Sequence, residues 1–292
     1  MTDFEMKLKE YTGFIDDKLN TVLVNTGKNY DVLTEAMLYS LTVGGKRIRP
    51  ILLLEFYKLC GGKDNAALPF ALALEMIHTY SLIHDDLPCM DNDDFRRGKP
   101  SCHKAFSENI AVLAGDALLT DAFRVACTTD LPSDRVVKAL NILANLSGVN
   151  GMIGGQVIDI CSEGNAINEE ILHDMYQLKT GALIKAAAAI GCILAGKYDF
   201  LPLAEQYAEN IGLSFQITDD ILDLKSTADV LGKPINSDIK NNKTTFVKLY
   251  GIKESEKKVT ELTEDAKNVI DKISGNGEFL KELADYLAQR NY

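Results

Sequence analysis

Apolar residues recur every three or four positions along almost the whole chain, which is the spacing of helices that pack against a core. Segments such as 70–86 and 186–196 are apolar nearly all round and are typical of central helices in a large bundle. The charged stretch 253–271 indicates an outer amphipathic helix. We find no convincing run of alternating apolar and polar residues that would indicate strands. The pattern predicts an all-α protein of about ten helices.

Two of the apolar helices carry a stripe of polar residues on one face. In the segment 70–86 the stripe contains His78, Ser81 and Asp85, at i, i+3 and i+7. In the segment 209–224 it consists of Gly212, Gln216, Asp219 and Asp223. A single stripe of this kind is usually a solvated helix face. Two acidic stripes on otherwise apolar helices favour a polar cavity inside the bundle, because buried carboxylates must be paired or bind a metal.

The second stripe has the donor atoms of a magnesium site. Asp219 and Asp223 lie one helical turn apart, and Asp220 lies alongside them. Mg²⁺ prefers a few carboxylate oxygens together with water and phosphate oxygens. The run "DDILD" therefore predicts a magnesium ligand set.

The first acidic run, "DDLPCMD", needs a bend to act in the same way. Asp85 and Asp91 are six residues apart and would not share a face in a continuous helix. Pro88 should end the helix, so that the chain folds back and brings Asp91 toward Asp85. Zinc is not expected, because neither run has a neighbouring pair of His or Cys ligands. We expect Asn92, Asp93 and Asp94 to be turn residues rather than ligands.

Basic residues accompany both acidic runs. The segments "GGKRIRP" and "RRGK" contain Lys46, Arg47, Arg49, Arg96, Arg97 and Lys99, and Lys233 and Lys243 follow later. The Walker A pattern is absent. Many of the 31 Lys and Arg residues are ordinary surface charges. Basic clusters beside acidic metal sites nevertheless indicate a polyanion bridged by Mg²⁺, and diphosphate fits best.

Composition narrows the class and the location of the protein. A net charge of −11 and a pI near 4.9 argue against nucleic-acid binding. The N-terminus has mixed charges and no apolar signal region, and the longest apolar stretch, 186–196, is shorter than the ~20 residues of a membrane span. The six cysteines form no CxxC pair, which favours reduced, mostly buried thiols. We expect a soluble cytoplasmic protein with a single domain over residues 1–292, because no linker divides it.

Seven segments occur in an order that resembles one known family. They are "GGKRIRP", "SLIHDDLPCMDNDDFRRGKPSCHKAF", "LAGDALL", "GGQVIDI", "KTGALI", "FQITDDILD" and "LGKPINSDIKNNKTTF". Their sequences and order are similar to those of the trans-isoprenyl diphosphate synthases, the family of farnesyl and geranylgeranyl diphosphate synthases. The resemblance covers nearly the whole chain, and it implies one polyprenyl synthetase domain, an isoprenoid-synthase bundle of about ten core helices around a central cavity, and a homodimer.

The resemblance also implies a set of site residues. About three Mg²⁺ ions would be held by Asp85, Asp86, Asp91, Asp219, Asp220 and Asp223. Isopentenyl diphosphate would be held by Lys46, Arg49, His78 and Arg97, with Gly45 in the same loop. The allylic diphosphate would face Arg96, Lys179, Thr180, Gln216, Lys233 and Lys243. The reaction would be ionisation of the allylic diphosphate, attack by the isopentenyl double bond and loss of a proton to the departing diphosphate. The Lys179 carbonyl, the Thr180 hydroxyl and the Gln216 amide could stabilise the carbocation as dipoles.

Product length is the finer question. In this family the product grows along the helix before the first acidic motif, and Tyr80 and Ser81 stand five and four residues before Asp85. A bulky side chain there shortens the cavity, so Tyr80 favours a C15 product, farnesyl diphosphate. The motif spacing is similar to that of bacterial farnesyl synthases and also of plant-type geranylgeranyl synthases, so a C20 product is the alternative. Tyr80 could also be an ordinary core residue.

Three other functions compete with chain elongation. A terpene cyclase would share the fold, but cyclases usually lack a full isopentenyl site and an intact second acidic motif. A regulatory subunit of a heteromeric synthase would lose acidic motifs, and this chain has both. A plain metal-binding helical protein would leave the arginines and the Lys179–Thr180 pair unexplained.

Overall fold

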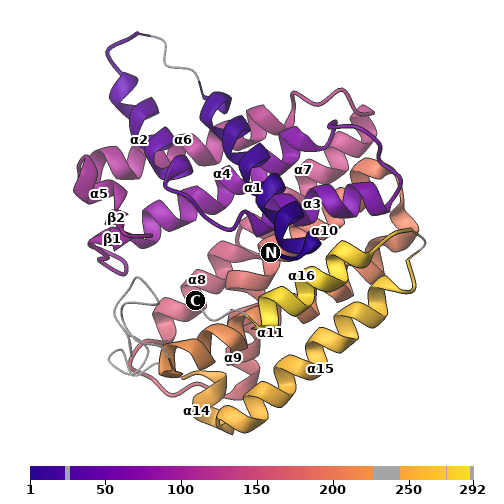
Figure 1. The fold of residues 1–292 in the computed structure, drawn as a ribbon. Coiled ribbons are helices and arrows are strands. Elements are labelled where there is room, and N and C mark those ends of the chain that lie inside the picture. Colours follow the sequence, from indigo (N-terminus) through magenta and orange to yellow (C-terminus); the bar gives the residue numbers. More distant parts are fainter. Residues whose placement is uncertain (24–26, 226–243, 274, 290–292) are drawn as a thin grey trace. The chain divides into compact units, whose positions relative to one another are not determined.

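The computed structural model describes residues 1–23, 27–225, 244–273 and 275–289, and these residues are mostly helical (Figure 1). The expected all-α class is therefore confirmed. The chain forms two compact units, each described by itself below. The first unit comprises Met1–Leu54 and Asp64–Pro132, and the second comprises Glu55–Lys63 and Ser133–Tyr292.

The first unit is built around one apolar helix. Its helices are α1 (Asp3–Val22), α2 (Asp31–Thr42), the start of α3 (Ile48–Leu59), α4 (Leu68–Asp85), α5 (Cys102–Ala105) and α6 (Glu108–Ala126). Along α4 the side chains of Phe70, Leu74 and Ile77 are fully buried, as the sequence pattern predicts. This helix packs along α6, and α2 contacts both. Gly115 permits the close approach, because a Cβ there would lie 2.1 Å from Nε2 of His84.

A short hairpin also belongs to the first unit. Strands β1 (Phe95–Arg96) and β2 (Lys99–Pro100) pair antiparallel. The loop residues Arg97 and Gly98 have φ angles of 53° and 75°, the positive values of a type I′ turn. The hairpin was not expected from the sequence, because strands of two residues produce no alternating pattern. The Arg-Gly pair at the loop was the only local signal.

The second unit is a larger helical assembly. Its elements after the end of α3 are α7 (Ser133–Ser147), α8 (Met152–Ser162), α9 (Glu169–Tyr176), the π-helix η1 (Gln177–Gly181), α10 (Ala182–Ala195), the 3₁₀ helix η2 (Tyr198–Phe200), α11 (Leu201–Lys225), α14 (Phe246–Tyr250), α15 (Ile252–Ile270) and α16 (Glu278–Gln289). Helix α10 packs against α7 and α11, and α11 packs along α15 (Figure 1). The apolar face of α15 is buried in a core with Ile217 and Ile221 of α11, which confirms the expected amphipathic helix.

The structure bears on two features that the sequence raised, namely possible membrane spans and the state of the cysteines. Two helical stretches, Ser133–Ser162 and Glu169–Ala195, are long and apolar enough to cross a membrane by length and composition alone. Core helices of soluble proteins meet the same criteria, and the second stretch is 72% buried in its most apolar part. All six cysteines are free, as expected, but Cys89, Cys127 and Cys161 are exposed, so only half of the thiols are buried.

Candidate active site

The first acidic run bends as its proline predicts. Helix α4 ends at Asp85, three residues before Pro88. The backbone N–H of Asp91 then donates to the carbonyl of Asp85 at 2.9 Å, so the chain has folded back. Asn92 has a φ of 53°, which confirms its expected place in a turn. Asp85 is half-buried and Asp91 is exposed.

Asp86 differs from these two aspartates. Its side chain is 3% exposed, and both its carboxylate oxygens accept hydrogen bonds from Nε of Arg96, at 3.0 and 3.2 Å. The Nη2 atom of Arg96 also contacts Oδ1. Burial raises the pKa of Asp86, while Arg96 opposes the shift. The pair ties the hairpin to the end of α4, so two predicted site residues, a metal ligand and a diphosphate-binding cation, hold each other in this structure.

Several cations crowd around one histidine in the first unit. Nη1 of Arg49 lies 3.3 Å from Nε2 of His78, and the guanidinium of Arg97 occupies the space above Gly45, where a Cβ would meet Nη1 at 2.2 Å. Burial lowers the pKa of Arg49 to about 10; Glu75 opposes the shift and Arg97 adds to it.

The histidine in this cluster is held neutral. Burial, together with Arg49 and Arg97, holds the pKa of His78 well below its usual range. A guanidinium can only donate hydrogen bonds, so Nε2 of the neutral imidazole is the acceptor. Nε of Arg49 has no hydrogen-bond partner among the residues that the structure describes. Cations held this close repel one another, and an anion would relieve the repulsion.

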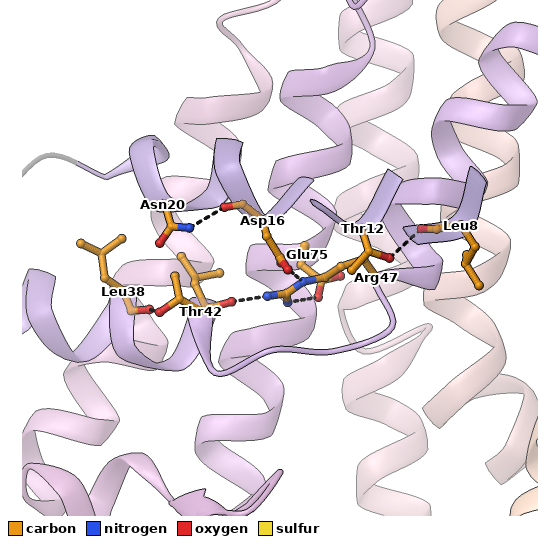
Figure 2. A network of polar contacts seen from close by, with 9 residues as sticks. Leu8, Thr12, Asp16, Asn20, Leu38, Thr42, Arg47 and Glu75 are labelled. Carbon is orange, nitrogen blue, oxygen red and sulfur yellow. Dashed lines mark hydrogen bonds and ion pairs between the residues drawn. The ribbon is translucent and has the colours of Figure 1, made fainter. Parts of the chain in front are cut away.

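Arg47 belongs to a different network, although the sequence groups it with Lys46 and Arg49. Its side chain is buried, and Figure 2 shows Asp16 and Glu75 directed toward its guanidinium. Nε donates to Asp16 and Nη1 to Glu75, both at 2.7 Å, and Nη2 donates to the carbonyl of Leu41 at 2.6 Å. The three guanidinium nitrogens therefore donate to acceptors on α1, α4 and α2. Arg47 anchors the loop, and its half-buried neighbours Lys46 and Arg49 remain the candidates for binding an anion.

The second acidic run lies on α11 in the second unit, and its carboxylates have unequal surroundings. Asp219 is half-buried, and Asp220 and Asp223 are buried. One oxygen of Asp220 accepts from the Tyr176 hydroxyl at 2.6 Å and from the backbone N–H of Phe246 at 3.0 Å. Both oxygens of Asp223 lack a hydrogen-bond partner within the described ranges. A buried carboxylate in that state needs a cation.

Lys179 and Thr180 lie in the π-helix η1. Such helices are rare and frequent at functional sites. Lys179 forms an ion pair with Asp159 at 2.5 Å, and the Thr180 hydroxyl donates to Oε1 of Gln216 at 2.9 Å. Helix α8 approaches closely, because a Cβ on Gly155 would lie only 2.1 Å from the backbone nitrogen of Lys179. Gly155 therefore permits the close approach that places Asp159 against Lys179.

Four side chains in these networks were not assigned from the sequence. They are Asp16, Glu75, Asp159 and Tyr176. A lone acid within an apolar helix was the available signal for Glu75. Asp159 follows Gly155 by four residues, and no local pattern indicated its partner. Tyr176 carried no signal, because a tyrosine in an apolar segment is usually a core residue.

The candidate product-length residues lie on α4. Tyr80 is 5% exposed, and its hydroxyl has no hydrogen-bond partner in the part of the chain that the structure describes. Its ring meets the ring of His84 edge-on, with centroids 5.8 Å apart. Burial, with a smaller effect of Asp85, raises the pKa of Tyr80 to about 12. The Ser81 hydroxyl donates to the carbonyl of His78 at 2.8 Å.

Two lysines predicted to face the allylic substrate, Lys233 and Lys243, lie outside the described residues.

The acidic residues fit magnesium in their chemistry. Carboxylate oxygens are the ligands that Mg²⁺ prefers, and the Asp223 carboxylate, which has no hydrogen-bond partner among the described residues, is suited to a cation. Within the described ranges, no three His, Cys, Asp or Glu side chains form a complete metal cage. Mg²⁺ rarely needs one, because it usually keeps several waters and shares phosphate oxygens of a substrate.

Comparison with known proteins agrees with this chemistry. Residues 30–280 match the family model described as polyprenyl synthetase. A geranylgeranyl diphosphate synthase of Cyanophora paradoxa is 44% identical over 97% of this chain and 95% of its own length. A farnesyl diphosphate synthase of Micrococcus luteus is 46% identical over 89% of each.

Solved structures give the same result. The geranylgeranyl pyrophosphate synthetase of Pyrococcus horikoshii superposes with a TM-score of 0.88 at 29% identity, over 99% of this chain and 98% of its own. A putative farnesyl-diphosphate synthase of Marinomonas superposes with a TM-score of 0.85 at 37% identity, over 99% and 100%. The chain therefore belongs to the polyprenyl synthetase family and is a prenyltransferase.

Proposed function

We propose that the protein condenses isopentenyl diphosphate with dimethylallyl and then geranyl diphosphate, giving (2E,6E)-farnesyl diphosphate and diphosphate. The observation that carries the proposal is the crowding of Arg49 and Arg97 around neutral His78. Two arginines that repel each other beside a neutral imidazole suit an anion with several negative charges, such as a diphosphate, which would accept their hydrogen bonds. Lys46 lies in the same loop as Arg49. We assign isopentenyl diphosphate to Lys46, Arg49, His78 and Arg97, and Gly45 makes room for the Arg97 guanidinium.

The acidic motifs supply the second part of the proposal. Prenyl diphosphate synthases generally use Mg²⁺. We assign about three ions to Asp85, Asp86, Asp91, Asp219, Asp220 and Asp223. When bound, Mg²⁺ neutralises charge that develops on a departing diphosphate. Asp86 and Asp220 accept hydrogen bonds from protein donors, whereas both oxygens of Asp223 lack a partner within the described residues, so Asp223 is our first choice as a direct ligand.

The allylic diphosphate would be bound by cations that are paired in this structure. Arg96 and Lys179 form ion pairs with Asp86 and Asp159, so the substrate must compete for their charge. Lys233 and Lys243 are further candidates from the family resemblance. Such cations stabilise the negative charge that grows as the allylic C–O bond ionises.

The residues near Thr180 would act on the carbocation. The Thr180 hydroxyl donates its proton to Gln216, so the lone pairs of the hydroxyl oxygen remain available to a positive centre. The isopentenyl double bond attacks the allylic cation, and the departing diphosphate accepts the proton that is lost. Exclusion of water protects the cation until this step is complete.

The C15 product is proposed from Tyr80. Its ring is buried one helical turn before Asp85, where a bulky side chain would limit the growing product. The relatives include both farnesyl and geranylgeranyl diphosphate synthases, so a C20 product is the second candidate. A terpene cyclase remains a weaker alternative in the same fold.

A chain-elongation assay tests the proposal. The pure protein is incubated with Mg²⁺, labelled isopentenyl diphosphate and either dimethylallyl or geranyl diphosphate, and the products are separated by length. We expect farnesyl diphosphate as the main product. Absence of elongation would refute the function, and a cyclised hydrocarbon formed without isopentenyl diphosphate would favour the cyclase. A mainly C20 product would refute only the assigned length.

We also propose that the protein acts in the cytoplasm on small-molecule substrates, as a homodimer without a nucleic-acid partner. Three large apolar residues lie on one face of α8, at i, i+4 and i+7, and all are exposed: Ile153, Val157 and Ile160. Val149, in the turn before α8, is exposed as well. Contiguous exposed apolar residues of this kind usually mark an interaction surface. We assign this surface to a second copy of the chain.

A further inference from the structure

A cluster of hydrogen bonds joins three elements of the second unit at Asp220. Tyr176 is the last residue of α9, Asp220 lies within α11, and Phe246 is the first residue of α14. The Tyr176 hydroxyl and the Phe246 N–H converge on the same oxygen, Oδ2, at 2.6 and 3.0 Å. Tyr176 and Asp220 are each 4% exposed. The short O···O distance is typical of a hydroxyl that donates to an ionised carboxylate.

The other oxygen of Asp220 continues the network toward the reacting groups. Nε2 of Gln216 lies 3.5 Å from Oδ1, and Oε1 of the same amide accepts from the Thr180 hydroxyl at 2.9 Å. These four residues therefore form one chain of hydrogen bonds, in which Thr180 donates to Gln216, and both Gln216 and Tyr176 donate to Asp220. A change at Tyr176 would be transmitted to the orientation of the Gln216 amide.

Asp220 also sits between two further carboxylates of the same motif. Asp223 is buried with both oxygens unpaired within the described residues, and Asp219 is adjacent in sequence. Three carboxylates within one helical turn repel one another. A donor that fixes one of them reduces that repulsion and helps to orient the motif toward a cation.

We propose that Tyr176 is a positioning residue of the second acidic motif: its hydroxyl fixes the Asp220 carboxylate and so prepares α11 to bind Mg²⁺ and diphosphate. This inference rests on the proposed function. It assigns a role to a residue that does not touch the reacting atoms and that belongs to neither acidic motif.

The second unit offers a matched control. Tyr207 is likewise buried, and its hydroxyl donates to the backbone carbonyl of Leu280 at 2.7 Å. It lies on α11 about three helical turns before Asp219, the first carboxylate of the motif.

Tyr176→Phe and Tyr207→Phe each remove one buried hydroxyl and the hydrogen bond that it donates. The Tyr176 hydroxyl also accepts from the backbone N–H of Phe246 at 3.3 Å, but this N–H keeps its shorter bond to Asp220 in the variant. A general loss of packing or stability should therefore affect both variants to a similar extent.

The experiment measures metal binding directly. Mg²⁺ is titrated calorimetrically into the full-length protein in the presence of inorganic diphosphate. We expect Tyr176→Phe to weaken Mg²⁺ binding by about 10- to 100-fold, the usual effect of losing a group that orients a metal ligand. Tyr207→Phe should bind Mg²⁺ as the wild type does. The rise in melting temperature on adding Mg²⁺ and diphosphate gives a second measurement that remains usable if a variant is less stable.

A double-mutant cycle shows whether the effect passes through Asp220. In an Asp220→Asn background, Tyr176→Phe should cause little further loss of Mg²⁺ affinity. Wild-type affinity in Tyr176→Phe, or an equal loss in Tyr207→Phe, would overturn the inference, and so would an undiminished effect in the Asp220→Asn background. Failure of the wild type to elongate isopentenyl diphosphate in a parallel assay would instead refute the proposed function.

Discussion

At the scale of single residues, burial decides which protonation state His78 adopts. The surrounding arginines and the loss of solvent both disfavour the imidazolium, so the folded protein keeps a neutral ring. An unfolded chain has no such constraint, and its histidine titrates near pH 6.5. The difference links the stability of the protein to pH.

His78 should make the protein less stable in mild acid. Its pKa is lower in the folded than in the unfolded state, so below about pH 6.5 the unfolded chain binds an extra proton and the free energy of unfolding falls with pH. His78→Gln should remove up to ~1.4 kcal/mol per pH unit of that dependence between about pH 6.5 and the lower folded pKa. Urea unfolding at several pH values measures the slope. Exposed His173→Gln is the control, and equal slopes for His78→Gln and wild type would contradict the prediction.

Tyr80 is the residue on which the assigned product length depends. Tyr80→Ala removes a buried ring and should lengthen the product beyond C15, as measured by chromatographic sizing of the dephosphorylated products. Tyr80→Phe keeps the ring and removes only the hydroxyl, so it should leave the product unchanged. If the two variants and the wild type all make the same product, Tyr80 does not limit its length.

At the scale of elements, the sequence predicts ends and faces better than it predicts partners. Pro88 correctly ends α4, and the fold-back to Asp91 follows from local geometry alone. The amphipathic pattern of α15 is likewise local. The ion pair between Asp86 and Arg96 depends on tertiary contacts between two segments. No spacing rule predicts which of several nearby carboxylates the arginine will bind. The position of a group could be predicted, but not which neighbour it would bind.

The contact between α8 and the π-helix depends on the absence of a side chain at Gly155. Gly155→Ala would place a Cβ 2.1 Å from a backbone nitrogen of η1, so the elements must move apart. Overpacking of this kind costs about 1–3 kcal/mol, and displacement of Lys179 should lower kcat as well. Chemical denaturation and the elongation assay measure the two effects.

Gly13 in α1 is the matched control for this prediction. It has open space around its Cα, so Gly13→Ala should stabilise the helix by up to about 1 kcal/mol and leave kcat unchanged. A Gly155→Ala variant as stable and active as the wild type would show that the two elements do not need this close approach.

At the scale of the whole molecule, the similarity to the family spans nearly the entire chain. The homodimer is a separate proposal. The apolar row along α8 is the surface that the proposed homodimer would cover. The periodicity of α8 predicts a helix, but periodicity alone does not reveal which apolar side chains the chain itself leaves uncovered. That distinction needs the tertiary structure.

A charge within this row should prevent association. Val157 is 54% exposed, so Val157→Glu should leave the fold intact while placing a carboxylate in the proposed interface. Light scattering coupled to gel filtration should give about half the wild-type mass. Val32→Glu, which alters an exposed valine of α2, should leave the mass unchanged. A monomeric wild type, or a Val157→Glu variant of wild-type mass, would remove α8 as the interface.

The anchoring of Arg47 has a consequence for the order in which the first unit forms. Its three acceptors lie on α1, α2 and α4, and Glu75 is 28 residues away along the chain. These hydrogen bonds can close only after all three helices have met, so they are expected to form after the folding transition state. Arg47→Met should therefore speed unfolding far more than it slows refolding, which stopped-flow kinetics in denaturant can resolve. The loop that we assign to substrate binding would then be among the last parts of the unit to form and the first to be lost.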